Sequence, residues 1–254
     1  MLRDLCGERF SSPGKSKGMR RRLQLIAVSV PVMAGFCIFS YFCLDKPVAH
    51  YCRSLGQNIR YFFNTITYFG DSKWYLIGSG ILFAYLRYIR KNVSWSNKSL
   101  FVFIAIASSG LSADLIKYTL GRYRPKMLFQ DGLYGFAFLH AGYGTTSFPS
   151  GHANTIAALA LTLYCLFPRY GLLYLCFAVL VSASRVIIGA HFLSDVVVGA
   201  YLGIVMTLLT RSYLESKGME IGPTAPGHVL CDARPSRREE RSDPSAQNTT
   251  GAQR

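Results

Sequence analysis

The amino-acid sequence predicts an all-α protein, a polytopic membrane bundle of about six transmembrane helices. Half of the 254 residues are hydrophobic and only 16% are charged, whereas a soluble domain carries about 25% charged residues. The mean hydropathy is +0.23, and the apolar residues gather in long runs with few charges. Such runs are typical of helices that cross a bilayer rather than of a core that faces water.

Six apolar runs account for this bundle, and they cover residues 23–44, 74–88, 100–116, 153–167, 170–188 and 192–210. The first run is about 20 residues long, enough to cross a bilayer, so we interpret it as an uncleaved helix. A cleaved signal peptide, which has a shorter apolar core and a small-residue cleavage site, remains the alternative. The second run is short for a span and needs residues on either side.

Lysine and arginine residues orient the predicted helices. Basic residues precede the first run, follow the second and occur in the turn after the fourth, and cytoplasmic flanks carry such an excess. Both termini are therefore expected in the cytoplasm. We expect a basic N-terminal segment (1–22), a six-helix membrane domain (23–210) and a polar tail (211–254), too poor in apolar residues to fold alone.

The net charge of +15 and the seven cysteines add little to this interpretation. Much of the positive charge flanks apolar runs, and no basic helix interleaved with exposed aromatics favours a nucleic-acid partner. The cysteines show no C-x-x-C spacing, so neither a zinc site nor a disulfide framework is indicated. We expect no metal and no cofactor.

Charged residues recur within the predicted helices at one level of the membrane, the external one, and these are Asp114, Lys117, Arg185 and Asp195. Each costs ~2.5–3.5 kcal/mol on insertion. One interpretation is that they pair with each other or reach the interface, and we favour a salt bridge to a nearby cation for Asp114. The others share their level with histidines and glycines, which favours a functional site.

His191 and Asp195 are four residues apart, so on a helix they share a face and can touch. A carboxylate bonded to one imidazole nitrogen fixes the tautomer and leaves the other nitrogen as a nucleophile. Taken alone, a pair with this spacing is more often a plain contact on a helix surface.

Ser150, Gly151 and His152 follow Pro149 at the start of the fourth apolar run. The first turn of a helix offers unpaired N–H groups that bind anions, and the Ser150 hydroxyl adds a donor. His152 is placed to protonate a leaving oxygen as a general acid. An ordinary helix cap with Ser150 at the N-cap is the alternative.

Three cations, Lys117, Arg124 and Arg185, are candidates for phosphate binding. Arginine holds phosphate through a bidentate fork, and lysine contributes a point charge. Together they would neutralise a phosphoryl group during transfer. For Arg122 and Lys126 we expect contacts at the membrane interface or with anionic headgroups.

In this order, the patterns Lys-x6-Arg-Pro, Pro-Ser-Gly-His and Ser-Arg-x5-His-x3-Asp resemble the three-part signature of the type 2 phosphatidic acid phosphatase family. All three parts match over residues 117–195, and the expected helices extend the resemblance over residues 23–210. The resemblance implies an all-helical fold and metal-independent hydrolysis of phosphate esters through a phosphohistidine.

Carried over residue by residue, the resemblance assigns a role to each candidate. It implies that Lys117, Arg124, Arg185, Ser150 and the Gly151 amide bind the phosphate. His152 would protonate the leaving group, His191 would attack phosphorus, and Asp195 would orient His191. Water would then hydrolyse the phosphohistidine.

We therefore expect a lipid phosphatase of a bacterial inner membrane, with its active site facing the periplasm. The substrate classes that fit are phosphatidate, phosphatidylglycerol phosphate, undecaprenyl diphosphate and the lipid A phosphates, and His140 and Tyr143 are candidate headgroup contacts. A phosphotransferase that passes the phosphoryl group to another lipid or sugar remains the main alternative. A non-catalytic lipid-binding protein is a further alternative, and the oligomeric state is open.

Overall fold

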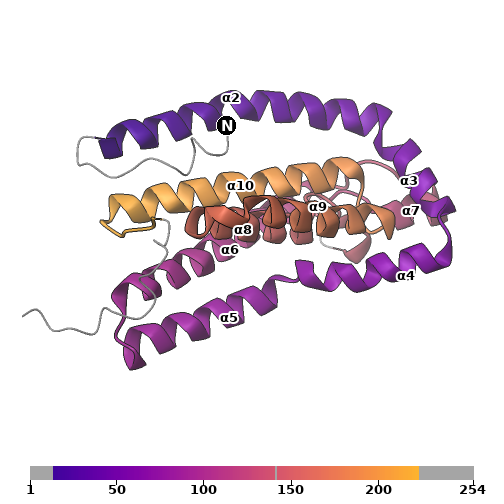
Figure 1. Cartoon of the computed structure of the whole chain (residues 1–254). Helices are drawn as coiled ribbons and strands as arrows, with labels where there is room; N and C mark the ends of the chain where they lie inside the picture. The colour runs from indigo at the N-terminus through magenta and orange to yellow at the C-terminus, as the bar shows by residue number, and fades with distance from the viewer. Residues whose placement is uncertain (1–13, 141, 223–254) are drawn as a thin grey trace, which may run out of the picture. The chain divides into compact units, whose positions relative to one another are not determined.

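The computed structural model describes residues 14–140 and 142–222, and these residues contain helices and no strands. The long helices are α2 (Gly14–Cys43), α5 (Ser72–Ala84), α6 (Val93–Leu120), α8 (Gly151–Leu166), α9 (Gly171–Ile187) and α10 (Leu193–Ser216). They lie roughly side by side (Figure 1). The predicted all-α membrane fold is thus confirmed, and each apolar run corresponds to one long helix.

Shorter elements connect the long helices. They are α3 (Asp45–Ser54), α4 (Gln57–Ile66), α7 (Pro125–Asp131), the 3-10 turns η1 (Thr67–Gly70), η3 (Tyr143–Thr145) and η4 (Pro168–Tyr170), and the π-helical turn η2 (Tyr85–Ile89). Helices α3, α4 and α7 gather at one end of the long helices (Figure 1). In the part of the chain that the structure describes, this end also holds the predicted site residues.

Four helical segments in the described residues are long and apolar enough to cross a membrane, and they are Gly18–Cys43, Val93–Leu120, Pro168–Ile187 and Leu193–Ser216. Helix α8 is apolar but shorter, and α5 reaches a comparable length only with η2. Large apolar side chains lie on outward faces, with Val32 70% exposed and Leu172 75% exposed. A bilayer stabilises such a surface, whereas water does not. The count of six spans remains a prediction.

Helix α8 occupies the centre of the helices described, packing against α6, α9 and α10. Two glycines of α10 permit its close approach to α8. A Cβ atom at Gly199 would lie 2.5 Å from the Ser150 carbonyl oxygen, and one at Gly203 would lie 2.3 Å from that of Asn154. Small residues four apart allow two membrane helices to touch backbone to backbone. This contact places the start of α8 beside the start of α10.

Two helices extend beyond the bounds predicted for the six-helix membrane domain. Helix α2 begins at Gly14, so residues 14–22 of the predicted N-terminal segment are helical. Helix α10 continues to Ser216, beyond the predicted start of the tail at residue 211. Residues 1–13 and 223–254 of these two segments lie outside the described residues.

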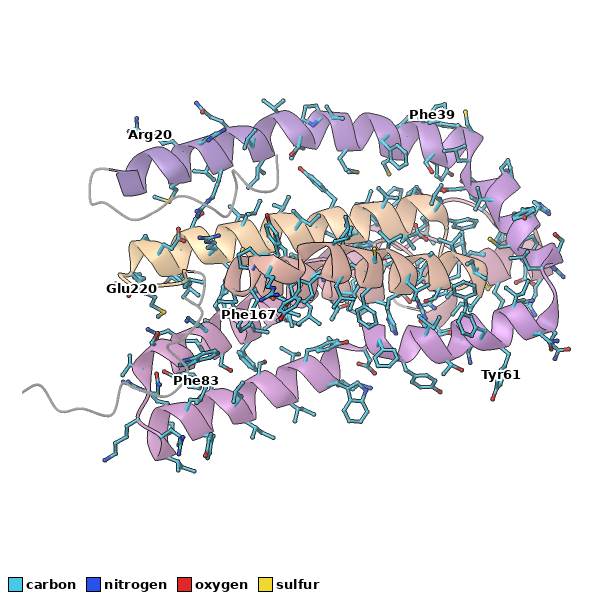
Figure 2. The ribbon with its side chains drawn as sticks, viewed as in Figure 1. Arg20, Phe39, Tyr61, Phe83, Phe167 and Glu220 are labelled. Carbon is cyan, nitrogen blue, oxygen red and sulfur yellow. The ribbon has the colours of Figure 1, made fainter. Side chains whose placement is uncertain are left out.

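A cluster of paired charges joins these two extensions at the end of the helices remote from the site. Glu215 accepts hydrogen bonds from Arg22 of α2 at 2.8 Å and from Arg211 at 2.7 Å. Arg20 and Glu220 lie at this end, whereas Phe39 and Tyr61 lie towards the other (Figure 2). Pairing lets charged residues continue a helix that hydropathy alone would end.

Replacing Glu215 by alanine is expected to destabilise the fold. The Glu215 side chain is only 14% exposed, so its loss leaves two poorly solvated arginines without their shared carboxylate. Breaking a buried pair in this way costs about 3 kcal/mol. Thermal unfolding in detergent should show a clearly lower Tm. As a control, Lys73→Ala removes an exposed pair with Asp71 and should change the Tm little. Equal Tm values for the two variants would contradict this.

Candidate active site

The first part of the site comes from the end of α6 and the chain that follows. Lys117 lies in the last turn of α6, and its Nζ pairs with Asp114 at 3.0 Å, as predicted for Asp114. Gly121 then ends the helix with φ of +58°, which a residue with a side chain adopts only with strain. A Cβ atom there would lie 2.0 Å from the Ala137 carbonyl oxygen. The turn directs the chain back so that Arg124 stands just before α7.

Helices α8 and α9 bring the second and third parts to the same end. Ser150 occupies the N-cap position of α8, and its N–H donates to the Asp195 carbonyl oxygen at 2.9 Å. Lys117 Nζ approaches Gly151, since a Cβ atom built on this glycine would lie 3.6 Å away. Arg185 lies in the last turn of α9. The structure therefore brings the three sequence patterns together at the ends of α6, α8, α9 and α10.

Several buried polar atoms in this region have no hydrogen-bond partner. They include Ser150 Oγ, Arg124 Nε and Arg185 Nε. Buried polar groups are nearly always paired, so unpaired donors that converge on one place indicate a ligand position. Neither arginine has a carboxylate within salt-bridge distance among the described residues. Ser150 makes no side-chain cap, which weakens the alternative of an ordinary helix cap.

Neighbouring residues orient the guanidinium groups of Arg124 and Arg185. Arg185 Nη1 donates to Thr67 Oγ1 of η1 at 2.6 Å. Arg124 lies 4.3 Å from the ring centroid of Tyr143 and donates to the Thr146 carbonyl oxygen at 3.4 Å. Each guanidinium is thereby oriented while its Nε stays unpaired. Nothing in the described contacts ties His140 to this cluster, whereas Tyr143 lies directly against it.

His191 is 4% exposed and lies in the short connection between α9 and α10. Its Nδ1 is 2.7 Å from the Ser147 carbonyl oxygen. A carbonyl only accepts, so Nδ1 carries the proton and Nε2 keeps a free lone pair. Burial lowers the pKa of His191 to about 4, and the charges of Arg185 and Arg124 act in the same direction, against the opposing effect of Asp195. The imidazole is therefore neutral at physiological pH.

His191 and Asp195 lie close together, as their spacing predicted, but at a distance longer than a hydrogen bond. His191 precedes the first residue of α10, and its Nδ1 lies 3.8 Å from Asp195 Oδ2. Asp195 Oδ2 instead accepts from the Phe192 N–H at 2.8 Å and from Ser147 Oγ at 2.6 Å. Since the Ser147 carbonyl in turn accepts from His191, Asp195 fixes the imidazole through Ser147. Spacing alone did not identify Ser147, because it lies in the loop before Pro149.

Arg122 was also predicted wrongly, because it is fully buried rather than at the interface. Its guanidinium donates to Asp195 Oδ1 and, at 2.6 Å, to Asp45 Oδ2. Burial alone would lower the pKa of Arg122, but the Asp195 and Asp45 carboxylates outweigh it and raise that pKa above its usual value. The sequence carried no signal for this pairing, since Asp45 and Arg122 are 77 residues apart.

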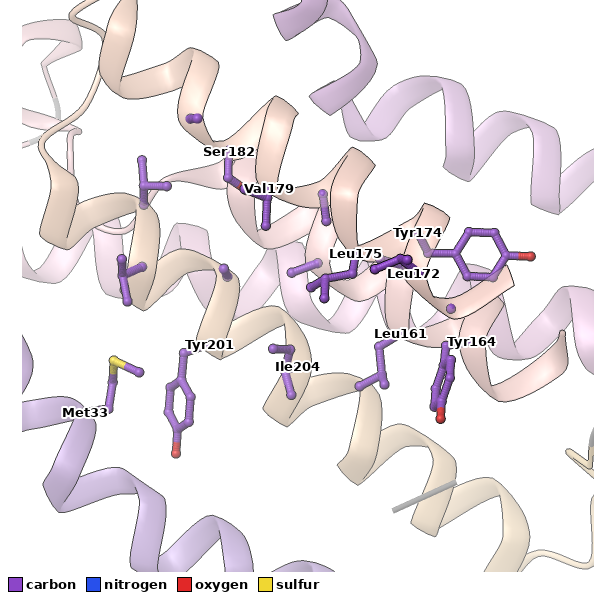
Figure 3. A pocket seen from close by; sticks show the side chains of 18 of the residues that line it. Met33, Leu161, Tyr164, Leu172, Tyr174, Leu175, Val179, Ser182, Tyr201 and Ile204 are labelled. Atoms are coloured by element: carbon purple, nitrogen blue, oxygen red, sulfur yellow. The ribbon is translucent and has the colours of Figure 1, made fainter. Parts of the chain in front are cut away.

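An apolar pocket of about 790 Å³ lies between α2, α8, α9 and α10. Met33, Leu161, Leu175 and Tyr201 are among its lining residues (Figure 3). It contains none of the eight predicted site residues, although Val186 and Val196 of its lining adjoin Arg185 and Asp195 in sequence. Its chemistry suits hydrocarbon, so the phosphate position lies outside it.

The chain is similar in sequence to a known protein family and to known phosphatases. The model of the PAP2 superfamily matches residues 98–218. The lipid A 1-phosphatase of Rhizobium johnstonii is 32% identical over 185 residues, which make up 68% of this chain and 74% of the relative. The chain belongs to the PAP2 superfamily. It is an integral-membrane phosphatase, a phosphoric ester hydrolase, as predicted.

Two further known proteins are similar to this chain. The lipid A 4'-phosphatase of Porphyromonas gingivalis is 25% identical over 174 residues, covering 63% of this chain and 70% of that protein. The crystal structure of a transmembrane PAP2 type phosphatidylglycerolphosphate phosphatase from Bacillus subtilis superposes with a TM-score of 0.56. It has 23% identity, and the match covers 77% of this chain and 96% of that one. At this identity the solved structure supports the PAP2 fold alone.

The low pKa of His191 predicts how the activity depends on pH. The acid limb of kcat/KM reports the free enzyme, and if His191 is the nucleophile, as predicted from the sequence, only its neutral imidazole attacks. A pKa of about 4 leaves His191 mostly neutral at pH 5, whereas the ordinary pKa of about 6.5 would leave it mostly protonated. We therefore expect kcat/KM to stay near its neutral-pH value down to pH 5. The titration of the substrate phosphate, recorded by phosphorus NMR, must first be corrected for. A remaining midpoint near pH 6.5 would contradict this.

Proposed function

We propose that this phosphatase removes the 1-phosphate of lipid A through a phosphohistidine on His191. The observation that carries the chemistry is the set of unpaired donors, Ser150 Oγ, Arg124 Nε and Arg185 Nε, at the helix ends where the neutral His191 lies. The preference for lipid A rests on the relative from Rhizobium johnstonii, which has this activity in its name.

The reaction takes place in two steps. Lys117, Arg124, Arg185, Ser150 and the Gly151 N–H bind the phosphoryl oxygens of the substrate. His191 Nε2 forms a bond to phosphorus while the bond from phosphorus to the sugar oxygen breaks, and His152 gives a proton to that oxygen.

Water then attacks the phosphohistidine with His152 as the base. This releases inorganic phosphate and restores the His191 lone pair and the His152 proton. The protein needs no metal for either step. Asp195 maintains the orientation of His191 through Ser147.

The membrane topology belongs to the same proposal. We place six spans in a bacterial inner membrane with both termini in the cytoplasm and the site at the periplasmic surface. The basic residues at the ends of α2, α5 and α8 remote from the site support this orientation. A lipid headgroup then reaches the site while its acyl chains stay in the bilayer.

The test is phosphate release by purified protein in detergent with EDTA, from lipid A, phosphatidate, phosphatidylglycerol phosphate and undecaprenyl diphosphate. We expect lipid A to be preferred and mass spectrometry to show loss of the 1-phosphate with the 4'-phosphate retained. Loss of the 4'-phosphate, or preference for another lipid, would overturn the substrate assignment. A labelled phosphate that appears on an acceptor lipid rather than in solution would favour the phosphotransferase.

A further inference from the structure

Two carboxylates share one fully buried guanidinium beside the proposed nucleophile. Arg122 is 0% exposed, and so are Asp45 and Asp195. Arg122 Nη1 donates to Asp195 Oδ1, and Nη2 donates to Asp45 Oδ2 at 2.6 Å. Such a triad loses the solvation of three charges, so excellent geometry is needed to maintain it.

Ser194 ties the same charges to the first turn of α10. Its N–H donates to Asp45 Oδ1 at 2.9 Å, which satisfies one of the unpaired N–H groups of a helix start. Its hydroxyl donates to Asp45 Oδ2 at 2.5 Å and accepts from Arg122 Nη1 at 2.6 Å. Asp45 begins α3, so a residue near the end of the first long helix fixes the start of the last one.

Aromatic rings surround the Arg122 guanidinium. The Arg122 guanidinium carbon lies 4.8 Å from the ring centroid of Phe192 and 5.1 Å from that of Tyr41. Tyr134 adds a hydroxyl at 3.4 Å from Nη2. The rings keep water out, and ion pairs act more strongly on their neighbours when water is excluded.

We propose that Asp45 and Arg122 are positioning residues that hold Asp195 in place and keep one net negative charge beside His191. This inference rests on the proposed function. Arg122 paired with Asp195 alone would cancel the charge of that carboxylate. Asp45 accepts a hydrogen bond from the second terminal nitrogen, Nη2. The three groups together therefore carry one net negative charge. His191 becomes cationic when phosphorus bonds to Nε2, and this charge stabilises that state.

The principal variant is Asp45→Asn, which keeps the shape and removes the negative charge. We expect kcat to fall about 10- to 100-fold, as for other partners that orient a catalytic group. KM and the inhibition constant for inorganic phosphate should stay within threefold, because Lys117, Arg124 and Arg185 are untouched. A purely structural role would change these constants together with kcat.

Glu215→Gln is the matched control, because Glu215 is also a poorly exposed carboxylate between two arginines but lies at the opposite helix ends. It should lower the Tm and leave kcat unchanged. If Asp45→Asn does not fold, Ser194→Ala is the milder test of the cluster. It should reduce kcat about threefold or more and leave the inhibition by inorganic phosphate unchanged.

The assay uses whichever lipid phosphate the wild-type protein hydrolyses, with His191→Ala measured alongside. If His191→Ala is inactive and folded Asp45→Asn, or Ser194→Ala in its place, retains kcat within twofold, the inference fails and the proposed function stands. Activity in His191→Ala would instead reject the proposed function. Parallel loss of kcat and phosphate inhibition would also overturn the positioning role.

Discussion

Replacing His191 by alanine is expected to lower kcat/KM by about 10⁵-fold or more for every lipid phosphate that the protein hydrolyses. The His191 imidazole keeps a free lone pair on Nε2. Its Nδ1 proton is held by the Ser147 carbonyl oxygen at 2.7 Å. Alanine provides no nucleophile, so phosphate release should fall to the rate of the bound ester in water. Colorimetric phosphate release measures this directly.

The control is His50→Ala, which removes an exposed histidine in the middle of α3 that packs against the Phe129 ring at 5.0 Å. It should retain wild-type activity. His191→Ala should bind inorganic phosphate nearly as well as the wild type, since the cationic residues remain. Turnover within tenfold of wild type by a folded His191→Ala protein would remove the covalent mechanism.

Replacing Arg185 by lysine is expected to lower kcat by about 10³-fold even though the charge is retained. Arg185 is 9% exposed, its Nη1 is occupied by Thr67 at 2.6 Å, and its Nε is unpaired. A fork oriented in this way gives two parallel bonds to a phosphoryl group, which lysine does not reproduce. Arginines that contact a transferring phosphoryl group contribute about 10³–10⁵-fold.

The Thr67→Val variant tests the orientation of the Arg185 guanidinium while Arg185 itself is retained. It removes the hydroxyl that accepts from Nη1 and leaves the guanidinium free to rotate. We expect a smaller loss of kcat, about 10-fold, because the charge and the fork both remain. Equal losses for Thr67→Val and Arg185→Lys would show that Thr67 acts in another way. An Arg185→Lys protein with wild-type kcat would place Arg185 outside the reaction.

Hydropathy was sufficient to predict the long helices but not their ends. Local contacts determine the ends, as at α6, which begins at Val93, seven residues before the predicted start, where the Asn92 side chain caps the Trp95 N–H at 3.1 Å. At α10 the helix continues because Glu215 pairs with Arg22 and Arg211. A pairing between residues nearly 200 positions apart leaves no local signal in the sequence.

The sequence predicted the candidate phosphate-binding and catalytic side chains, but it did not predict the side chains that support them. The three sequence patterns located the cations, both histidines and Ser150. The pattern predicted the proximity of His191 and Asp195, which lie 3.8 Å apart, but not Ser147, which bonds to both of them. Asp45 and Arg122 escaped prediction because a charge next to an apolar run usually lies at the membrane interface. Only the tertiary fold shows that both are enclosed.

The most direct test of the account is to trap the phosphorylated protein. A lipid substrate labelled in its phosphate is mixed with enzyme, and the reaction is stopped in alkali, where phosphohistidine survives and acyl phosphate does not. We expect label on the wild-type protein, located on the peptide that contains His191, and none on His191→Ala. Phosphate release by the wild type with no labelled protein at any time, or label retained by His191→Ala, would contradict the covalent mechanism.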